Sequence, residues 1–176
     1  MDLIIKSVRT QYYSEENLVK LRESLDHLRL AINSVQFRAR IFSHTPFNTP
    51  QRYNNRQIYE IIMSGKEIRT EIDNEADLDL TLDSRHSSDI IGYTRDTKIF
   101  TFRNMFDSLS PWHLAGHYAH EYCHTLNFYD PADFNEIESN VPYEVGRIIA
   151  SGMMENRLEI TNELAEEPHV NRLIRV

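Results

Sequence analysis

The chain has 176 residues and a mass of 20.8 kDa, which fits one domain, and we expect residues 1–176 to form a single domain. With 40% hydrophobic and 26% charged residues, its composition excludes a largely disordered or collagen-like chain. The net charge of −8 at pH 7 provides no general attraction to nucleic acid or to anionic membranes, so neither is expected as a partner.

The sequence contains no segment typical of a membrane or secreted protein. No apolar run reaches the roughly 18–20 residues that span a bilayer, and Met1–Lys6 lacks the long apolar core of a signal peptide. The single Cys123 excludes an intramolecular disulfide. A reducing compartment, the cytoplasm, is therefore the default expectation.

The first part of the chain predicts a strand over Asp2–Thr10 and then a long helix that begins after Ser14. Ser14 can cap this helix, and apolar residues recur along it at helical spacing, which predicts one face packed on the core. These residues are Leu18, Leu21, Leu25, Leu28, Ile32 and Val35. A short strand is predicted over Phe37–Phe42, followed by a loop over Ser43–Asn55.

The middle of the chain predicts a short amphipathic helix and several strands. The helix covers Arg56–Ser64 and is ended by Gly65. The acidic run Glu71–Asp79 is expected to be solvated, and Leu78–Leu82 alternates as a half-buried strand should. Further on, Ile90–Thr94 and Lys98–Phe102 predict a hairpin around Arg95-Asp96-Thr97.

The C-terminal part predicts two helices. Ser110-Pro111 is a typical helix start, and the helix should run over Pro111–Asn127. A loop with two prolines then leads to a helix over Tyr143–Asn156, and the tail Arg157–Val176 is expected to be helical up to Pro168.

The chemistry is concentrated on the Pro111–Asn127 helix, which contains His120-Glu121-Tyr122-Cys123-His124, the H-E-x-x-H pattern of zinc peptidases. Residues four apart lie above one another on a helix, so both imidazoles can bind one Zn²⁺. Glu121 is rotated by about 100° from His120, which leaves its carboxylate beside the metal rather than on it. The pattern predicts a zinc site with Glu121 as the general base.

Two residues compete for the position of the third zinc ligand. The motif extends to H-E-x-x-H-x-x-N-x-x-D, with Asn127 and Asp130 where metzincins have glycine and histidine. Asparagine tolerates the left-handed conformation that such a helix end needs, and a carboxylate oxygen is an accepted zinc ligand. Glu144 is the alternative, because thermolysin-like enzymes take a glutamate as the third ligand. We favour Asp130, since Asn127 then explains the helix end as well.

Three other residues of this helix are interpreted as structural. His113 and His117 lie on roughly the same arc as the motif histidines and are expected to form part of the cleft wall rather than to bind the metal. Cys123 points away from the ligand face and is expected to be a small packing residue.

The stretch from Gly92-Tyr93-Thr94 to Val141-Pro142-Tyr143-Glu144-Val145-Gly146 resembles small zincin-type metallopeptidases of the metzincin branch. These bacterial and phage-encoded proteins carry H-E-x-x-H-x-x-G-[FY]-x-H followed by V-P-Y-x-[IV]-G, and the resemblance covers about the second half of the chain. It implies that His120 and His124 ligate zinc and that Glu121 is the base. The third histidine of the family falls on Asp130, its glycine on Asn127, and Glu144 takes a variable place, which argues against Glu144 as a ligand.

The expected fold is α+β and zincin-like, with a mixed sheet packed on the long N-terminal helix, the Lys98–Arg103 strand bordering the cleft and the Pro111–Asn127 helix on its floor. The expected function is that of a zinc-dependent endopeptidase, a hydrolase acting on peptide or protein substrates, with Tyr143 donating a hydrogen bond to the oxyanion. Two alternatives stay open. One is a zincin-fold binding or structural protein that no longer cleaves, and the other is a metal-dependent amidase for a non-protein amide such as a cell-wall crosslink.

Overall fold

A computed structural model describes residues 2–68 and 71–151. These residues form an α+β fold around a four-stranded mixed sheet with the strand order β1-β2-β4-β3. The strands are β1 (Ile4–Gln11), β2 (Glu75–Asp83), β3 (Gly92–Arg95) and β4 (Lys98–Phe102). Strands β1, β2 and β4 are parallel, and β3 pairs antiparallel with β4. The predicted hairpin is therefore confirmed, and it places β3 at the edge of the sheet.

The central strand β2 shows why one face of the sheet is covered. Ala76, Leu78 and Leu80 are fully buried on one face, while the alternating Asp77 and Asp79 lie on the other. The interpretation of residues 71–79 as a solvated charge run was thus partly wrong. The strand begins four residues into that run, because alternation with apolar residues satisfies one buried face and one polar face.

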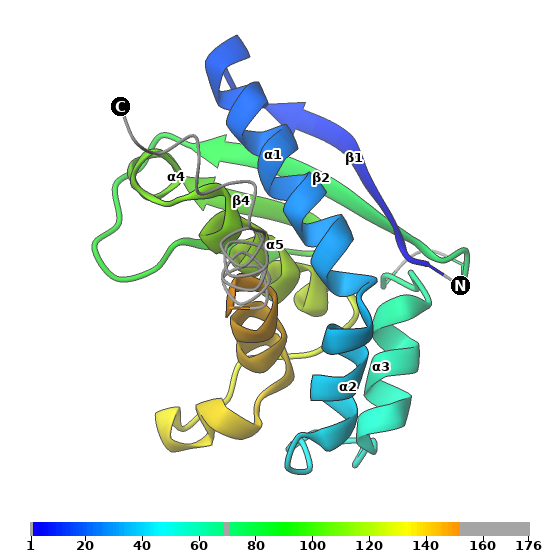
Figure 1. Cartoon of the computed structure of the whole chain (residues 1–176). Coiled ribbons are helices and arrows are strands. Elements are labelled where there is room, and N and C mark those ends of the chain that lie inside the picture. The colour runs from blue at the N-terminus through cyan, green and yellow to red at the C-terminus, as the bar shows by residue number, and fades with distance from the viewer. Residues whose placement is uncertain (1, 69–70, 152–176) are drawn as a thin grey trace, which may run out of the picture.

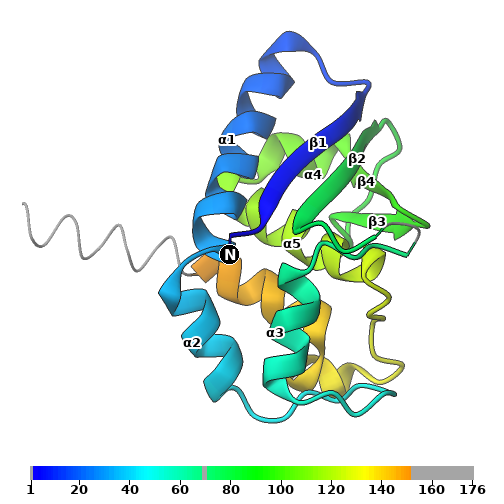
Figure 2. The same cartoon turned by 90° about the vertical axis from the view of Figure 1, so that its right-hand side faces the viewer.

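Helix α1 (Glu15–Ile32) covers the sheet as predicted. Its N-cap Ser14 forms a capping box with Asn17, and its buried leucines pack against β1 and against the central helix α5. Figures 1 and 2 show α1 and α5 on the same side of the sheet. Val35 does not extend the apolar stripe, because it starts the next helix and is 77% exposed.

The strand predicted over Phe37–Phe42 is wrong. Helix α2 (Val35–Ser43) occupies this segment, and the side chain of Ser34 caps it by accepting a hydrogen bond from the Phe37 amide. Phe37 and Ile41 are four residues apart and both are buried, which is a helical and not a strand period.

The predicted short helix is confirmed as α3 (Asn55–Met63). Gly65 follows it with a φ of 64°, the left-handed conformation expected of a helix stop. Helices α2 and α3 pack on each other at the end of the molecule where residues 134–151 also lie (Figures 1 and 2).

The second half of the chain contains α4 (Arg103–Ser108), the central helix α5 (Pro111–Thr125) and the 3₁₀ helix η1 (Phe134–Ser139). Residues 141–151 are helical, so the helix predicted from Tyr143 begins two residues earlier. The remainder of that helix and the predicted tail fall outside the described residues. In the part of the chain that is described, no helix combines the length and the apolar character needed to cross a membrane.

Candidate metal centre

The central helix α5 is buried on nearly all sides, and its histidines mark where it meets solvent. Ten of its 15 residues are buried, among them Tyr118 and Tyr122. His120 and His124 are only partly buried, in contrast to their neighbours. The imidazoles of His120 and His124 are therefore the part of α5 that a ligand in the adjoining space can reach.

The end of α5 turns the chain back toward these histidines. The helix ends at Thr125, two residues earlier than predicted, because Asn127 adopts a φ of 70°. The Asn127 amide donates to His124 O at 3.0 Å, and the Phe128 amide donates to Cys123 O at 3.1 Å. These two bonds form a Schellman motif, with Asn127 in the left-handed position usually held by glycine. The left-handed role predicted for Asn127 is thereby confirmed.

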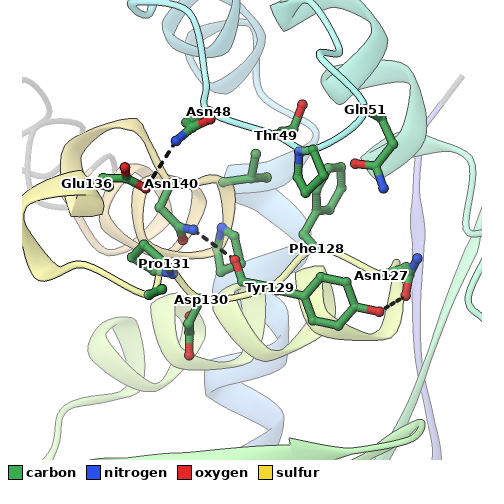
Figure 3. A pocket seen from close by; sticks show the side chains of 14 residues that line it. Asn48, Thr49, Gln51, Asn127, Phe128, Tyr129, Asp130, Pro131, Glu136 and Asn140 are labelled. Atoms are coloured by element: carbon green, nitrogen blue, oxygen red, sulfur yellow. Dashed lines mark hydrogen bonds between the residues drawn. The ribbon is translucent and has the colours of Figure 1, made fainter.

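The segment that follows the turn brings Asp130 to the histidines. The Nδ1 atom of His124 lies 2.8 Å from the carbonyl oxygen of Phe128, and Asn140 donates to the carbonyl of Tyr129 at 2.8 Å. Figure 3 shows this second bond and shows the Asp130 side chain pointing toward α5. The segment is thus fixed from both sides.

Three candidate ligand atoms form a nearly equilateral triangle. His120 Nε2 lies 3.2 Å from His124 Nε2, and Asp130 Oδ1 lies 3.4 Å from the first nitrogen and 3.5 Å from the second. The adjacent imidazoles, His120 first, lower the pKa of the Asp130 carboxyl and favour its ionised form. The structure brings together the three residues that the sequence singled out.

The triangle matches the dimensions of a tetrahedral zinc site. Zinc–nitrogen and zinc–oxygen bonds of about 2.0–2.1 Å give a tetrahedron edges of about 3.3–3.4 Å. The observed separations of 3.2, 3.4 and 3.5 Å bracket that value. The hydrogen bond of His124 Nδ1 to a carbonyl also requires the proton on Nδ1, which leaves the Nε2 lone pair available for a metal. The three residues could therefore hold a metal ion, and their donor atoms are among those that Zn²⁺ accepts.

Glu121 lies beside the triangle with its carboxylate held in place. It is 3% exposed, and the Thr94 hydroxyl donates to its Oε2 at 2.7 Å. Burial raises the pKa of the Glu121 carboxyl above its usual range, while the imidazole of His120 and the Thr94 hydrogen bond act in the opposite direction.

His117 lines the groove beside the triangle, as predicted for a residue of the cleft wall, but its contact with Glu121 was not predicted. It is 6% exposed, its Nδ1 lies 3.5 Å from Glu121 Oε1, and its Nε2 lies 3.1 Å from the hydroxyl of Thr101. Burial lowers the pKa of the imidazole to about 3, so His117 is neutral at physiological pH. One proton on Nδ1 would serve Glu121 while Thr101 donates to Nε2.

The edge strand β3 is shaped to accept this arrangement. A Cβ atom on Gly92 would lie 2.0 Å from the backbone oxygen of Phe100 and 2.7 Å from Cε1 of His117, so only glycine fits between the β4 backbone and the imidazole. Two residues further along the same strand, Thr94 reaches Glu121. A glycine inside a strand indicates close approach of another group, and Gly92 is the sequence signal that points to His117.

Tyr143 approaches the triangle from the helix that spans residues 141–151. Its ring stands edge-on to that of His120, with 4.8 Å between centroids. Two glycines permit this approach, because a Cβ on Gly116 would lie 2.7 Å from the carbonyl oxygen of Gly146. Partial burial raises the pKa of the Tyr143 phenol, which therefore stays protonated at neutral pH.

Glu144 is paired with residues outside the triangle. It is 3% exposed, and its carboxylate accepts from Nε of Arg147 at 2.9 and 3.0 Å and from Nη2 at 2.5 Å. Its Oε2 also lies 3.2 Å from Nε2 of His44. These partners occupy Glu144, so the alternative third ligand of the sequence is engaged elsewhere.

The triangle opens into a groove of about 820 Å³, whose walls include Gly92, Thr94, Glu121 and Tyr143. The strand that borders this groove is β3, not β4 as predicted, because β3 forms the sheet edge next to α5. A smaller polar cavity of about 240 Å³ adjoins the groove and shares Tyr129 and Asp130 with it. Figure 3 shows this cavity, with Asn48, Gln51 and other amide side chains around it.

His113 and Cys123 of α5 lie where the sequence predicts them. His113 lines the groove and lies 2.7 Å from the hydroxyl of Ser110, in agreement with a wall residue. Cys123 is fully buried, and burial raises the pKa of its thiol, so it packs in the core as predicted. No protein-family profile, curated protein or solved structure matches this chain in the comparisons with known proteins.

Proposed function

We propose that the protein is a zinc-dependent endopeptidase of zincin type, with His120, His124 and Asp130 as the metal ligands and Glu121 as the general base. The observation that carries the proposal is the triangle of ligand atoms, whose three sides agree with the edges of a tetrahedral zinc site. Glu121 lies next to the triangle without belonging to it, as the division between ligand and base requires.

Bound zinc would polarise the scissile carbonyl and lower the pKa of a water to about 7. Glu121 accepts the proton of the attacking water and delivers it to the leaving amine. The hydroxyl of Thr94 and the imidazole of His117 each face one carboxylate oxygen of Glu121. They position the carboxylate so that it needs no reorientation between the two proton transfers.

Tyr143 supports the transition state in this proposal. Its phenol stays protonated at neutral pH and stands beside His120 at the groove wall. A hydrogen bond donated to the developing oxyanion is worth most in a site where water is partly excluded.

The edge strand favours a peptide as the substrate. Strand β3 ends the sheet, and its residues Gly92, Tyr93 and Thr94 line the groove. An extended peptide can add to such an edge by main-chain hydrogen bonds, which recognise the backbone irrespective of sequence. Peptide and protein substrates therefore fit the groove better than a non-protein amide does.

The burial of Glu121 argues against a protein that only binds. Enclosing a carboxylate at 3% exposure costs free energy unless donors compensate it, and the core would be more stable with an apolar residue there. A fold that retains the carboxylate, orients it with Thr94 and leaves it facing the groove is best explained by catalysis.

The test combines metal content with hydrolysis. Wild-type protein should contain about one zinc per chain by elemental analysis and should cleave peptides of a proteome-derived library, as detected by mass spectrometry. Glu121→Gln should retain zinc and lose about 10²–10⁴-fold in kcat, the usual contribution of general-base catalysis. Undiminished cleavage by Glu121→Gln would remove Glu121 from the mechanism, and cleavage of cell-wall fragments instead of peptides would favour the amidase.

A further inference from the structure

One cationic side chain in the groove has no role in the chemistry described so far. Arg147 lines the groove from the helix over residues 141–151, and its side chain is 63% exposed. Among the described residues that line the groove it is the one lysine or arginine, whereas carboxylates come from Asp89, Asp96, Glu121 and Asp130. The groove therefore offers a negatively charged group one favourable position.

Arg147 is held in place from behind. Its Nε and Nη2 atoms contact the buried carboxylate of Glu144 at 2.5–3.0 Å, and Glu144 is in turn contacted by His44. Fixing an arginine in one geometry costs rotamer entropy. Because Glu144 has already ordered the guanidinium, a ligand that binds Arg147 does not have to meet that cost.

The geometry of the guanidinium leaves a binding edge open. Glu144 uses the edge formed by Nε and Nη2. The second edge, formed by Nη1 and the other Nη2 hydrogen, is a planar fork that matches the two oxygens of a carboxylate. The exposure of the side chain indicates that this edge is open to the groove or to solvent.

The position of Arg147 along the groove sets its distance from the scissile bond. The preceding residue, Gly146, packs against Gly116 and lies close to His120. Gly116 and His120 are four residues apart on α5, about 6 Å along the axis. An extended peptide advances about 3.3 Å per residue. A group bound by Arg147 therefore belongs to a residue one or two positions from the cleaved bond.

We infer that Arg147 binds a substrate carboxylate one or two residues from the scissile bond and makes the enzyme selective for acidic peptides. The inference rests on the proposed peptidase function. The carboxylate belongs to an Asp or Glu side chain or to the C-terminus of the peptide, and the chemistry of recognition is the same for both.

The test compares matched peptides. Three peptides share one cleavage site found in the library digest: one with Glu near the site and an amidated C-terminus, one with Gln in its place, and one Gln peptide that ends two residues after the site with a free carboxylate. A charge-assisted hydrogen-bonded pair at this exposed position should raise kcat/KM about two- to fivefold over the neutral amidated peptide. The peptide that shows the gain identifies the source of the carboxylate.

Variants assign this preference to Arg147. In Arg147→Gln the ratio of kcat/KM for the acidic peptide to that for the neutral peptide should fall close to one. Arg147→Lys should keep part of the preference, because the positive charge remains while the planar two-donor edge of the guanidinium is lost. The matched control is Arg56→Gln, an exposed arginine on α3 that pairs with Glu60 outside the groove, and it should keep the wild-type ratio. A preference that survives in Arg147→Gln, or that is absent from the wild type, would overturn the inference.

A binding measurement separates this inference from the proposed function. Calorimetric titration of the same peptides into Glu121→Gln measures affinity without cleavage, and the acidic peptide should bind about two- to fivefold more tightly than its neutral match. Equal binding, or no binding, refutes the role of Arg147. If Glu121→Gln cleaves as fast as the wild type, the proposed mechanism is refuted instead. The role of Arg147 is then still tested by the ratio of kcat/KM for the acidic and neutral peptides.

Discussion

Replacement of Asp130 by alanine should release zinc, because it removes one of the three ligand atoms of the candidate metal centre. Asp130 Oδ1 stands 3.4 and 3.5 Å from the two imidazole nitrogens, so alanine would leave a two-nitrogen site. Glu144, the alternative ligand, is already bound by Arg147 and His44. Loss of an outer hydrogen-bonding partner weakens metal sites about 10–100-fold. The loss of a direct ligand should exceed about 100-fold in Kd, or about 2.7 kcal/mol.

The assay is competition for zinc against a chromophoric chelator, followed by absorbance. Glu144→Gln is the matched control and should leave the zinc Kd nearly unchanged, because an amide of the same shape remains between Arg147 and His44. Asp130→His should retain zinc, since it supplies a nitrogen ligand from the same position. If Glu144→Gln released the metal while Asp130→Ala kept it within tenfold of the wild type, the ligand triangle would be the wrong site.

Three further outcomes follow from the site and its supports. Thr94→Val should retain zinc but lose about tenfold in kcat, the equivalent of one hydrogen bond to the charged Glu121, and Thr94→Ser should restore it in the peptide assay. Asn127→Gly should be tolerated, whereas Asn127→Val should cost about 1–2 kcal/mol in urea unfolding and weaken zinc binding, because its φ of 70° suits glycine and penalises a branched side chain. Gly116→Ala should destabilise the protein by about 1–3 kcal/mol in the same unfolding assay, since the new Cβ would lie 2.7 Å from the Gly146 carbonyl. An unchanged urea midpoint would mean that α5 and the helix over residues 141–151 can move apart without loss of stability.

Elements with local determinants were predictable from the sequence. Ser14 with its following leucines, the hairpin around Asp96 and the Ser110-Pro111 helix start each carry their signal within a few residues, and the structure contains all of them. Helix α2 was missed because Phe37–Phe42, in which apolar residues alternate with two arginines, fits a short strand as well as a helix. The signal that decides it is the cap Ser34, which lies outside the run that was read as a strand.

The partners of Glu121 were not predictable in the same way. In the sequence, Thr94 has the features of an ordinary strand residue. It contacts Glu121 because the β3–β4 register and the packing of β3 on α5 bring the two side chains together. His117 shares a helix face with the motif, but the sequence does not say that Thr101 would enclose it. Both contacts are tertiary, and Gly92 is the local sequence feature that reflects the close packing of β3 on His117.

The third ligand shows how far local chemistry can decide between two tertiary arrangements. Asp130 and Glu144 are both carboxylates at workable distances from His124 in the chain, and spacing alone leaves them as rivals. The two residues differ in the path of the backbone that carries each carboxylate and in the partners that each carboxylate has. The left-handed residue Asn127 completes two hydrogen bonds to the end of α5 and returns the chain to His124 within four residues, a local event that any sequence with a tolerant residue there can achieve. Glu144 is buried and paired with Arg147 and His44, and it would have to give up both partners to reach the same nitrogens. The hydrogen bonds that engage Glu144 outside the candidate metal centre are also those that order Arg147 over the groove.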